Sequence, residues 1–184
     1  MRNNLIFKNN IYNVVPDHLK ETTVQYKKAL AGLVLDCQAM LFDYAHRLET
    51  ESIDEKTVHE IIDFLGNKLG TLLPENAQSW AFEEKVQFVR TKVNRPLRAC
   101  GMVKNVGEPG GGPFWAKSSD GSISLQVVES AQVDMQDSTQ KELFTQATHF
   151  NPVDLICTMK NHKGEKFDLL KFRDAETGFI TEKS

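Results

Sequence analysis

Apolar side chains recur every three or four residues between positions 19 and 48, and no other feature of the sequence constrains the fold as strongly. Side chains at this spacing lie on one face of an α-helix. The stripe consists of Leu19, Tyr26, Leu30, Leu33, Cys37, Met40, Leu41, Tyr44 and Leu48. The sequence therefore predicts one long amphipathic helix, and Asp17 stands where its N-cap is expected.

The rest of the first 96 residues predicts a strand and two more helices. The apolar run at residues 5–7 is followed by asparagines, which is typical of a buried strand that enters a loop. The Ser-Ile-Asp-Glu sequence at residues 52–55 has the arrangement of a capping box, and the apolar spacing after it predicts a second helix that ends at Gly70. A third helix is expected at residues 82–93, because Pro96 would close it.

From residue 97 onward the helical spacing gives way to short alternating runs between glycine and polar turns. This pattern predicts strands, with one short helix at residues 138–147. The expected strands are residues 97–103, 114–117, 123–129, 153–159 and 167–172, the last two joined as a hairpin. The expected fold class is α/β, with residues 1–96 as a strand plus helical segment and residues 97–184 as a glycine-rich loop and a mostly antiparallel or mixed sheet.

Composition narrows the classes of protein that remain. A chain of 184 residues can bury a core without disulfides or metal, and a formal charge of -3 with scattered basic residues argues against a nucleic-acid binder. The three cysteines are far apart and odd in number, which favours reduced thiols in the cytoplasm. No apolar run approaches the roughly 20 residues that a spanning helix needs, so no membrane partner is expected.

Three successive glycines, Gly110, Gly111 and Gly112, form the most unusual short motif. Glycine permits positive φ and leaves backbone N–H groups uncovered, so the segment could face an anion, with Glu108 beside it. The motif lacks the lysine and hydroxyl of a phosphate-binding loop. A structural connection between strands is the alternative interpretation.

Polar side chains near strand ends supply the other candidate site residues. Gln126 and Glu129 stand on and after the strand at residues 123–129, and His149, Asn151 and Asp154 lie in one turn-to-strand transition. An amide, a carboxylate and a histidine could bind a sugar or an anion together. Ordinary roles at the polar rim of a sheet are the commoner alternative. No cluster with zinc-ligand spacing and no nucleophile elbow is present.

Five stretches in order carry a resemblance to a known family. The stretches VVPDHLKETTVQYKKALAG, RACGMVKNVGEPGGGPFW, SLQVVESAQVDM, THFNPVDLIC and KGEKFDLLKF closely resemble the bacterial family called domain of unknown function 4301 (DUF4301). Family members are longer than this chain and are similar to sugar-nucleotide pyrophosphorylases. The resemblance therefore implies part of a nucleotide-diphospho-sugar-transferase-like fold.

The same resemblance implies a nucleotide and metal loop in the stretch between Leu5 and Asp17, with Asn10 and Asn13 as its candidates and Mg²⁺ as the cofactor. The Asp-Asn pair of the family reads Tyr12-Asn13 here, and a phenol is a poor magnesium ligand. The upstream half of the family has no counterpart, so we expect an internal piece of a longer protein. A sheet without its neighbours would expose an apolar surface around the first strand and along the first helix, through which the chain could self-associate.

Two functions from different classes follow. The first is the phosphosugar or nucleotide-sugar side of a nucleotidyltransferase-like protein, inactive as an isolated chain. The second is a non-catalytic binding or protein-interaction domain, in which the glycines are structural and the apolar face docks another polypeptide.

Overall fold

The computed structural model describes residues 5–8, 16–107, 110–152 and 154–180. The helices are α1 (Lys20–Thr50), α2 (Glu55–Leu69), α3 (Phe82–Val93) and α4 (Ser138–Thr145), with short 3-10 turns η1 (Asp17–Leu19), η2 (Glu75–Ser79), η3 (Ser130–Gln132) and η4 (Leu169–Phe172). The strands are β1 (Leu5–Lys8), β2 (Thr71–Leu72), β3 (Arg98–Cys100), β4 (Val103–Lys104), β5 (Gly112–Lys117), β6 (Ile123–Val128), β7 (His149–Phe150) and β8 (Leu155–Thr158).

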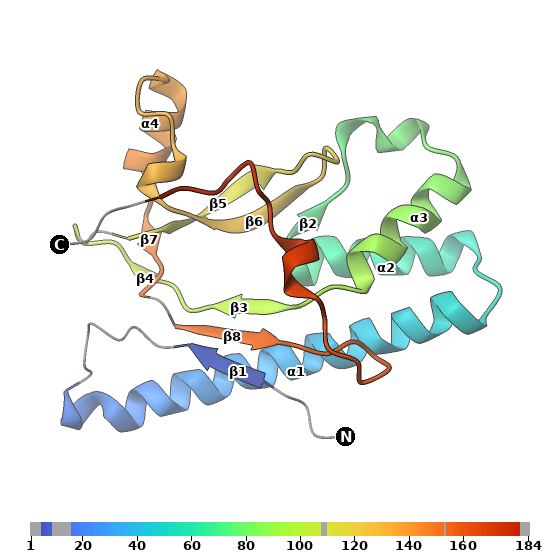
Figure 1. Ribbon diagram of the computed structural model, residues 1–184, viewed down its shortest axis with the longest axis horizontal. Helices are drawn as coiled ribbons and strands as arrows, with labels where there is room; N and C mark the ends of the chain where they lie inside the picture. The colour runs from blue at the N-terminus through green and yellow to red at the C-terminus, as the bar shows by residue number, and fades with distance from the viewer. Residues whose placement is uncertain (1–4, 9–15, 108–109, 153, 181–184) are drawn as a thin grey trace.

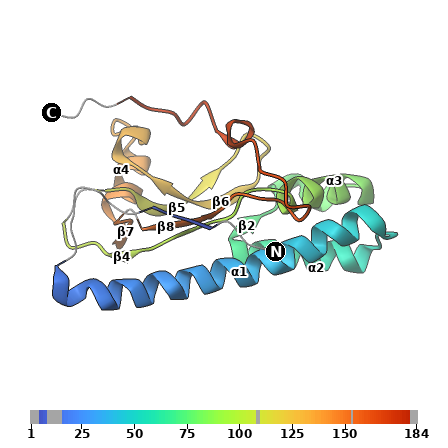
Figure 2. The same ribbon diagram turned by 60° about the horizontal axis from the view of Figure 1, so that its bottom comes forward.

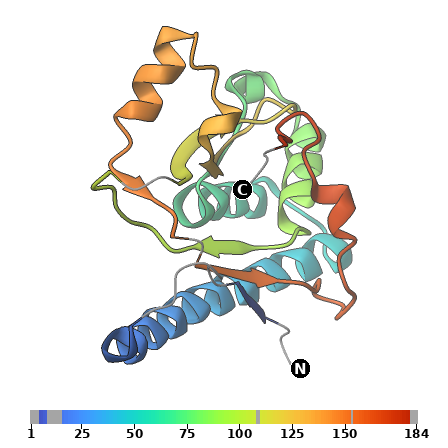
Figure 3. The same ribbon diagram turned by 60° about the vertical axis from the view of Figure 1, so that its left-hand side comes forward.

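The described strands form three small antiparallel sheets, in the orders β1-β8-β3, β2-β6-β5 and β4-β7. In the first sheet Leu5 pairs with Thr158 and Arg98 pairs with Cys157, so strands from both ends of the chain share one sheet. That sheet lies along α1 (Figures 1 and 3). The architecture is thus mixed α/β with antiparallel pairing throughout the described part.

The core has two centres, both of which use α1. The larger joins α1 to α2 and α3, where Ile61 and Val89 are wholly buried. The smaller joins α1 to the first sheet, where Val34 packs with Ile156. The long predicted helix is confirmed, and its apolar face divides because the C-terminal half packs on helices while the middle packs on a sheet.

Helix ends differ from two of the predictions. Asp54, rather than Ser52, is the N-cap of α2, and its carboxylate accepts a hydrogen bond from the Thr57 N–H at 2.8 Å. Asp17 does not cap α1, because it lies within η1 and pairs with Lys20. Asp54 caps α2 because its carboxylate reaches a free backbone N–H at the start of that helix, whereas no side-chain hydrogen bond caps the start of α1 among the described residues.

Two predicted strands are also corrected. Residues 167–172 contain η4 in place of a strand. The expected hairpin is reduced to a bridge between Lys160 and Lys166, with a hydrogen bond from the Phe167 N–H to the Met159 carbonyl beside it. The carboxylate of Asp168 accepts a hydrogen bond from the Leu170 N–H at 3.2 Å, a local bond that competes with a strand ladder. The predicted strand at residues 97–103 is interrupted at Gly101, whose N–H donates to the Asp154 carbonyl.

Candidate functional site

The triglycine segment packs against protein atoms at its second and third positions. Gly111 and Gly112 are buried. A Cβ on Gly111 would lie 2.8 Å from Val127 Cγ1 and 2.9 Å from Glu129 Oε1, and a Cβ on Gly112 would lie 2.9 Å from a Phe114 ring carbon. Neither glycine is among those with positive φ. The bare backbone at these two positions therefore makes room for neighbouring side chains, which corresponds to the structural alternative.

Asn151 holds two backbone segments together beside the glycines. It is only 8% exposed. Its side-chain amide donates a hydrogen bond to the Gly101 carbonyl at 2.7 Å, and its backbone N–H donates to the Gly111 carbonyl at 2.7 Å. The amide thus fixes the position of the triglycine strand relative to the turn after β3.

The remaining candidates have separate partners. The exposed His149 has its Nδ1 2.9 Å from the Thr148 hydroxyl. Gln126 accepts a hydrogen bond from the Arg98 guanidinium at 3.3 Å. Asp154 forms an ion pair with Lys27 of α1 at 3.3 Å.

The structure therefore brings Gly111, Glu129 and the backbone of Asn151 together, while Gln126 and Asp154 engage β3 and α1. The predicted Glu108, Asn10 and Asn13 lie outside the described residues.

Two hollows in the described structure are lined by other residues. A hollow of about 410 Å³ lies beside α2 and η2, with His59 and Lys85 among its lining residues. A space of about 10 Å³, the room that one water molecule needs, lies between α1 and the turn after β8. Gln38 and His162 line the smaller space. Gln38 Oε1 and His162 Nδ1 are buried, and neither atom has a hydrogen-bond partner within the described part of the chain. Its size suits a water rather than a substrate.

Metal and thiol chemistry find little support in the described part of the chain. No group of three or more His, Cys, Asp or Glu side chains there could hold a metal ion. The three cysteines are free, and burial raises the pKa of the Cys37 and Cys100 thiols, so few thiolates form at neutral pH.

The described helices include none that is long and apolar enough to cross a membrane.

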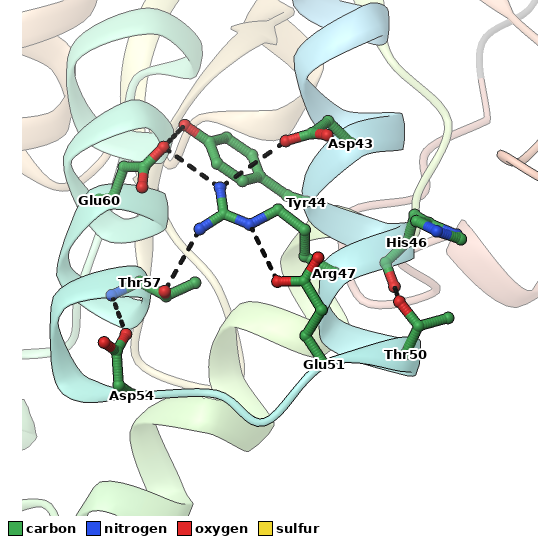
Figure 4. A network of polar contacts seen from close by, with 9 residues as sticks. All are labelled: Asp43, Tyr44, His46, Arg47, Thr50, Glu51, Asp54, Thr57 and Glu60. Atoms are coloured by element: carbon green, nitrogen blue, oxygen red, sulfur yellow. Dashed lines mark hydrogen bonds and ion pairs between the residues drawn. The ribbon is translucent and has the colours of Figure 1, made fainter.

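An ion-pair network fixes the C-terminal half of α1 against α2 (Figure 4). The Tyr44 hydroxyl donates to Glu60 at 3.1 Å, and the Arg47 guanidinium donates to Thr57 at 3.3 Å and approaches Glu60 at 3.5 Å. Burial, and then the hydrogen bond to Glu60, raise the pKa of Tyr44 to about 12. The network is structural, because each of its groups is engaged by the neighbouring helix.

A buried lysine forms a second polar cluster that the sequence analysis missed. Lys92 Nζ lies 2.7 Å from Asp120 Oδ2 and 2.8 Å from Ser122 Oγ, and the lysine side chain is 6% exposed. The sequence does contain a signal, because Lys92 stands between Val89 and Val93 on the apolar side of α3. Ser122 is 1% exposed, so this serine beside a lysine cannot reach a substrate, and the cluster fastens the β5–β6 turn to α3.

One face of α1 carries exposed apolar side chains at regular intervals. Tyr26, Leu33 and Met40 are 70%, 56% and 43% exposed, and they stand seven residues apart. Ile6 and Phe7 of β1 are exposed as well. Figure 2 shows α1 along one border of the molecule, with the sheets to one side of it. The exposed apolar surface predicted around the first strand and the first helix is therefore present.

Comparison with known proteins identifies the family of this chain but gives no activity for it. The family described as a domain of unknown function (DUF4301) matches residues 1–184. No curated protein matches the chain, and no solved structure does.

Proposed function

We propose that this chain, which belongs to the domain-of-unknown-function family DUF4301, is a binding module that docks a second polypeptide on the exposed face of α1. The observation that carries the proposal is the exposed apolar stripe on this helix. The face of α1 that packs into both centres of the core adjoins this stripe, yet Tyr26, Leu33 and Met40 remain exposed at regular intervals. Scattered apolar residues are normal on a surface, but a stripe of them along one helix is typical of an interface.

The energy available to this surface is sufficient for modest affinity. Full burial of one large apolar side chain contributes about 1.5–3 kcal/mol. Tyr26, Leu33 and Met40 are each roughly half exposed, so covering all three contributes on the order of 3 kcal/mol before the cost of association. A stable complex therefore needs additional contacts, for which the exposed Phe7 is a candidate, because it lies on the same face of β1 as Leu5, which packs against the core beside α1.

Photo-crosslinking in the cell tests the docking role directly. A photoreactive residue replaces Met40 in the full chain, and a second version carries it at Lys141, an exposed position on α4. We expect a polypeptide adduct at position 40 that Leu33→Asp abolishes, and no such adduct at position 141. Absence of an adduct at position 40, or an adduct that Leu33→Asp leaves unchanged, contradicts the proposal.

A second candidate function, binding of a phosphosugar or nucleotide sugar, is the one that the family resemblance implies, and Glu129, which lies beside Gly111, is the residue through which we test it. The resemblance to nucleotidyltransferase-like proteins and the Mg²⁺ it implies add to this candidate. A thermal shift with sugar phosphates or nucleotide sugars, with and without Mg²⁺, that Glu129→Gln removes would support it. Turnover is not expected, and release of pyrophosphate from a nucleoside triphosphate and a sugar phosphate would contradict that expectation.

A further inference from the structure

We infer that the polypeptide on α1 is a second copy of this chain, with the two α1 helices antiparallel and Leu33 at the two-fold axis. This inference rests on the proposed docking role of α1. It adds the identity of the partner, the direction of its helix and the residue at the centre of the contact.

The spacing of the exposed side chains is symmetric about Leu33. Tyr26 precedes Leu33 by seven residues and Met40 follows it by seven, so each lies about 10 Å from it along the helix. In an antiparallel pair, Tyr26 of one copy faces the partner's Met40, and the contact occurs twice. A flexible thioether against an aromatic ring is a favourable pairing. The same patch thus complements itself, as an isologous interface requires.

Gly32 supplies an independent reason to expect a close helix partner. It stands in the interior of α1, where glycine is less favourable than alanine because its backbone is freer in the unfolded chain. A Cβ on Gly32 would meet nothing within 4 Å, so no steric contact in the described part of the chain requires a glycine at this position. Together with the exposed Ala29, it leaves the surface beside Leu33 low enough for the backbone of another helix to approach.

The distribution of charge along α1 selects the antiparallel direction. Residues 20–34 hold three lysines and one glutamate, whereas residues 35–50 hold three carboxylates and one arginine. Some of these charges are paired within the chain, Lys27 with Asp154 and Asp43 with Arg47 for example, but Lys28 and Asp36 are exposed. An antiparallel pair sets each basic half beside an acidic half and also opposes the helix dipoles, while a parallel pair would set like halves together.

The exposed apolar face of α1 can be reached by another helix. In Figure 2 the sheets and α4 lie to one side of α1, α2 lies beside its C-terminal half, and its N-terminal half borders the molecule. Positions 20 to 46 of α1 are symmetric about Leu33, so helices in this register overlap over roughly 39 Å. A contact made mainly by one helix from each copy belongs to the small, transient class of interfaces, so we expect dissociation constants in the micromolar range.

Cysteine mapping tests the direction and the register. Tyr26→Cys and Met40→Cys are made separately, and each variant is oxidised alone and in a mixture, with the unmodified chain as the control for its three native thiols. We expect a disulfide-linked species in the mixture, at least fivefold above either variant alone, because only an antiparallel pair brings these positions within bonding distance. Efficient linkage of each variant alone, with no increase in the mixture, would show a parallel pair and overturn the inference.

Sedimentation equilibrium tests the contact itself. Leu33→Glu is compared with Leu143→Glu, which places the same charge on another exposed leucine, at 60% exposure on α4. Self-association should weaken at least tenfold in Leu33→Glu and stay unchanged in Leu143→Glu, with circular dichroism confirming that both are folded. A monomer at every concentration up to the millimolar range overturns the inference. If Met40 then crosslinks to a different protein in the cell, the docking role survives and only the identity of the partner is wrong.

Discussion

Removing the carboxylate of Asp120 should destabilise the fold more than removing its buried partner Lys92. In Asp120→Ala the ammonium of Lys92 keeps its hydrogen bond to Ser122 but loses its countercharge, while its side chain remains 94% covered. Breaking a fully buried ion pair in this way costs about 3–5 kcal/mol. The Asp120 side chain is 49% exposed, so water reaches the vacated position and we expect a cost of about 2 kcal/mol.

Lys92→Met is the matched variant, because it keeps the apolar stem beside Phe88 while removing the charge. The carboxylate left behind is half exposed, is solvated, and still accepts the hydrogen bond from Ser122 at 2.6 Å. We expect a cost of about 1 kcal/mol or less, and the double variant should resemble Lys92→Met. The free energy of unfolding is measured by urea denaturation at pH 7.

The pH dependence gives a second view of the same pair. Burial by itself raises the pKa of Asp120, but its hydrogen bonds with Lys92 and Ser122 outweigh burial and lower the pKa to about 2 from an ordinary 3.8. Because the folded pKa is the lower one, the stabilisation is complete above pH 4 and is lost as the pH falls from about 4 to about 2. The difference corresponds to roughly 2 kcal/mol, which we halve to about 1 kcal/mol because the Asp120 side chain is 49% exposed. This account of the pair is refuted if Lys92→Met lowers the free energy of unfolding as much as Asp120→Ala does, or if the double variant loses the sum of the two.

Three further changes should alter stability in directions that the backbone and hydrogen bonds predict. Gly32→Ala should raise the free energy of unfolding of the dilute monomer by about 0.5–1 kcal/mol, whereas Gly70→Ala should lower it by about 1 kcal/mol or more because Gly70 has φ 58°. Urea denaturation at low protein concentration compares the two variants. A lower free energy of unfolding in Gly32→Ala would contradict the open space around Gly32. Asn151→Ala should cost about 2 kcal/mol by leaving the Gly101 carbonyl without its donor, and hydrogen exchange should rise first around that turn. Tyr44→Phe should cost about 1 kcal/mol through the lost hydrogen bond to Glu60, and a thermal denaturation profile that stays unchanged would remove that bond from the account.

The candidate site was only partly accessible to sequence analysis. The expected strands around β5 and β6 are close in the chain, and their pairing places Glu129 beside Gly111. Asn151 comes 40 positions after Gly111 and meets it through a backbone hydrogen bond. Sequence analysis could not show that Gly111 is buried under Val127, nor that Asn151 uses its amide on the Gly101 backbone. Whether a ligand binds among these groups stays a prediction, which the thermal-shift experiment addresses.

The sequence by itself determined the helices and most strands, because periodic spacing and turn residues act over a few neighbouring positions. It also determined that α1 would carry apolar side chains beyond those its own core can cover. Only the tertiary structure decided that β1 and β3 flank β8, that Lys92 is buried against Asp120, and which side of α1 faces outward. Those outcomes depend on contacts between residues 28 to more than 150 positions apart, and no local pattern specifies which distant surfaces meet.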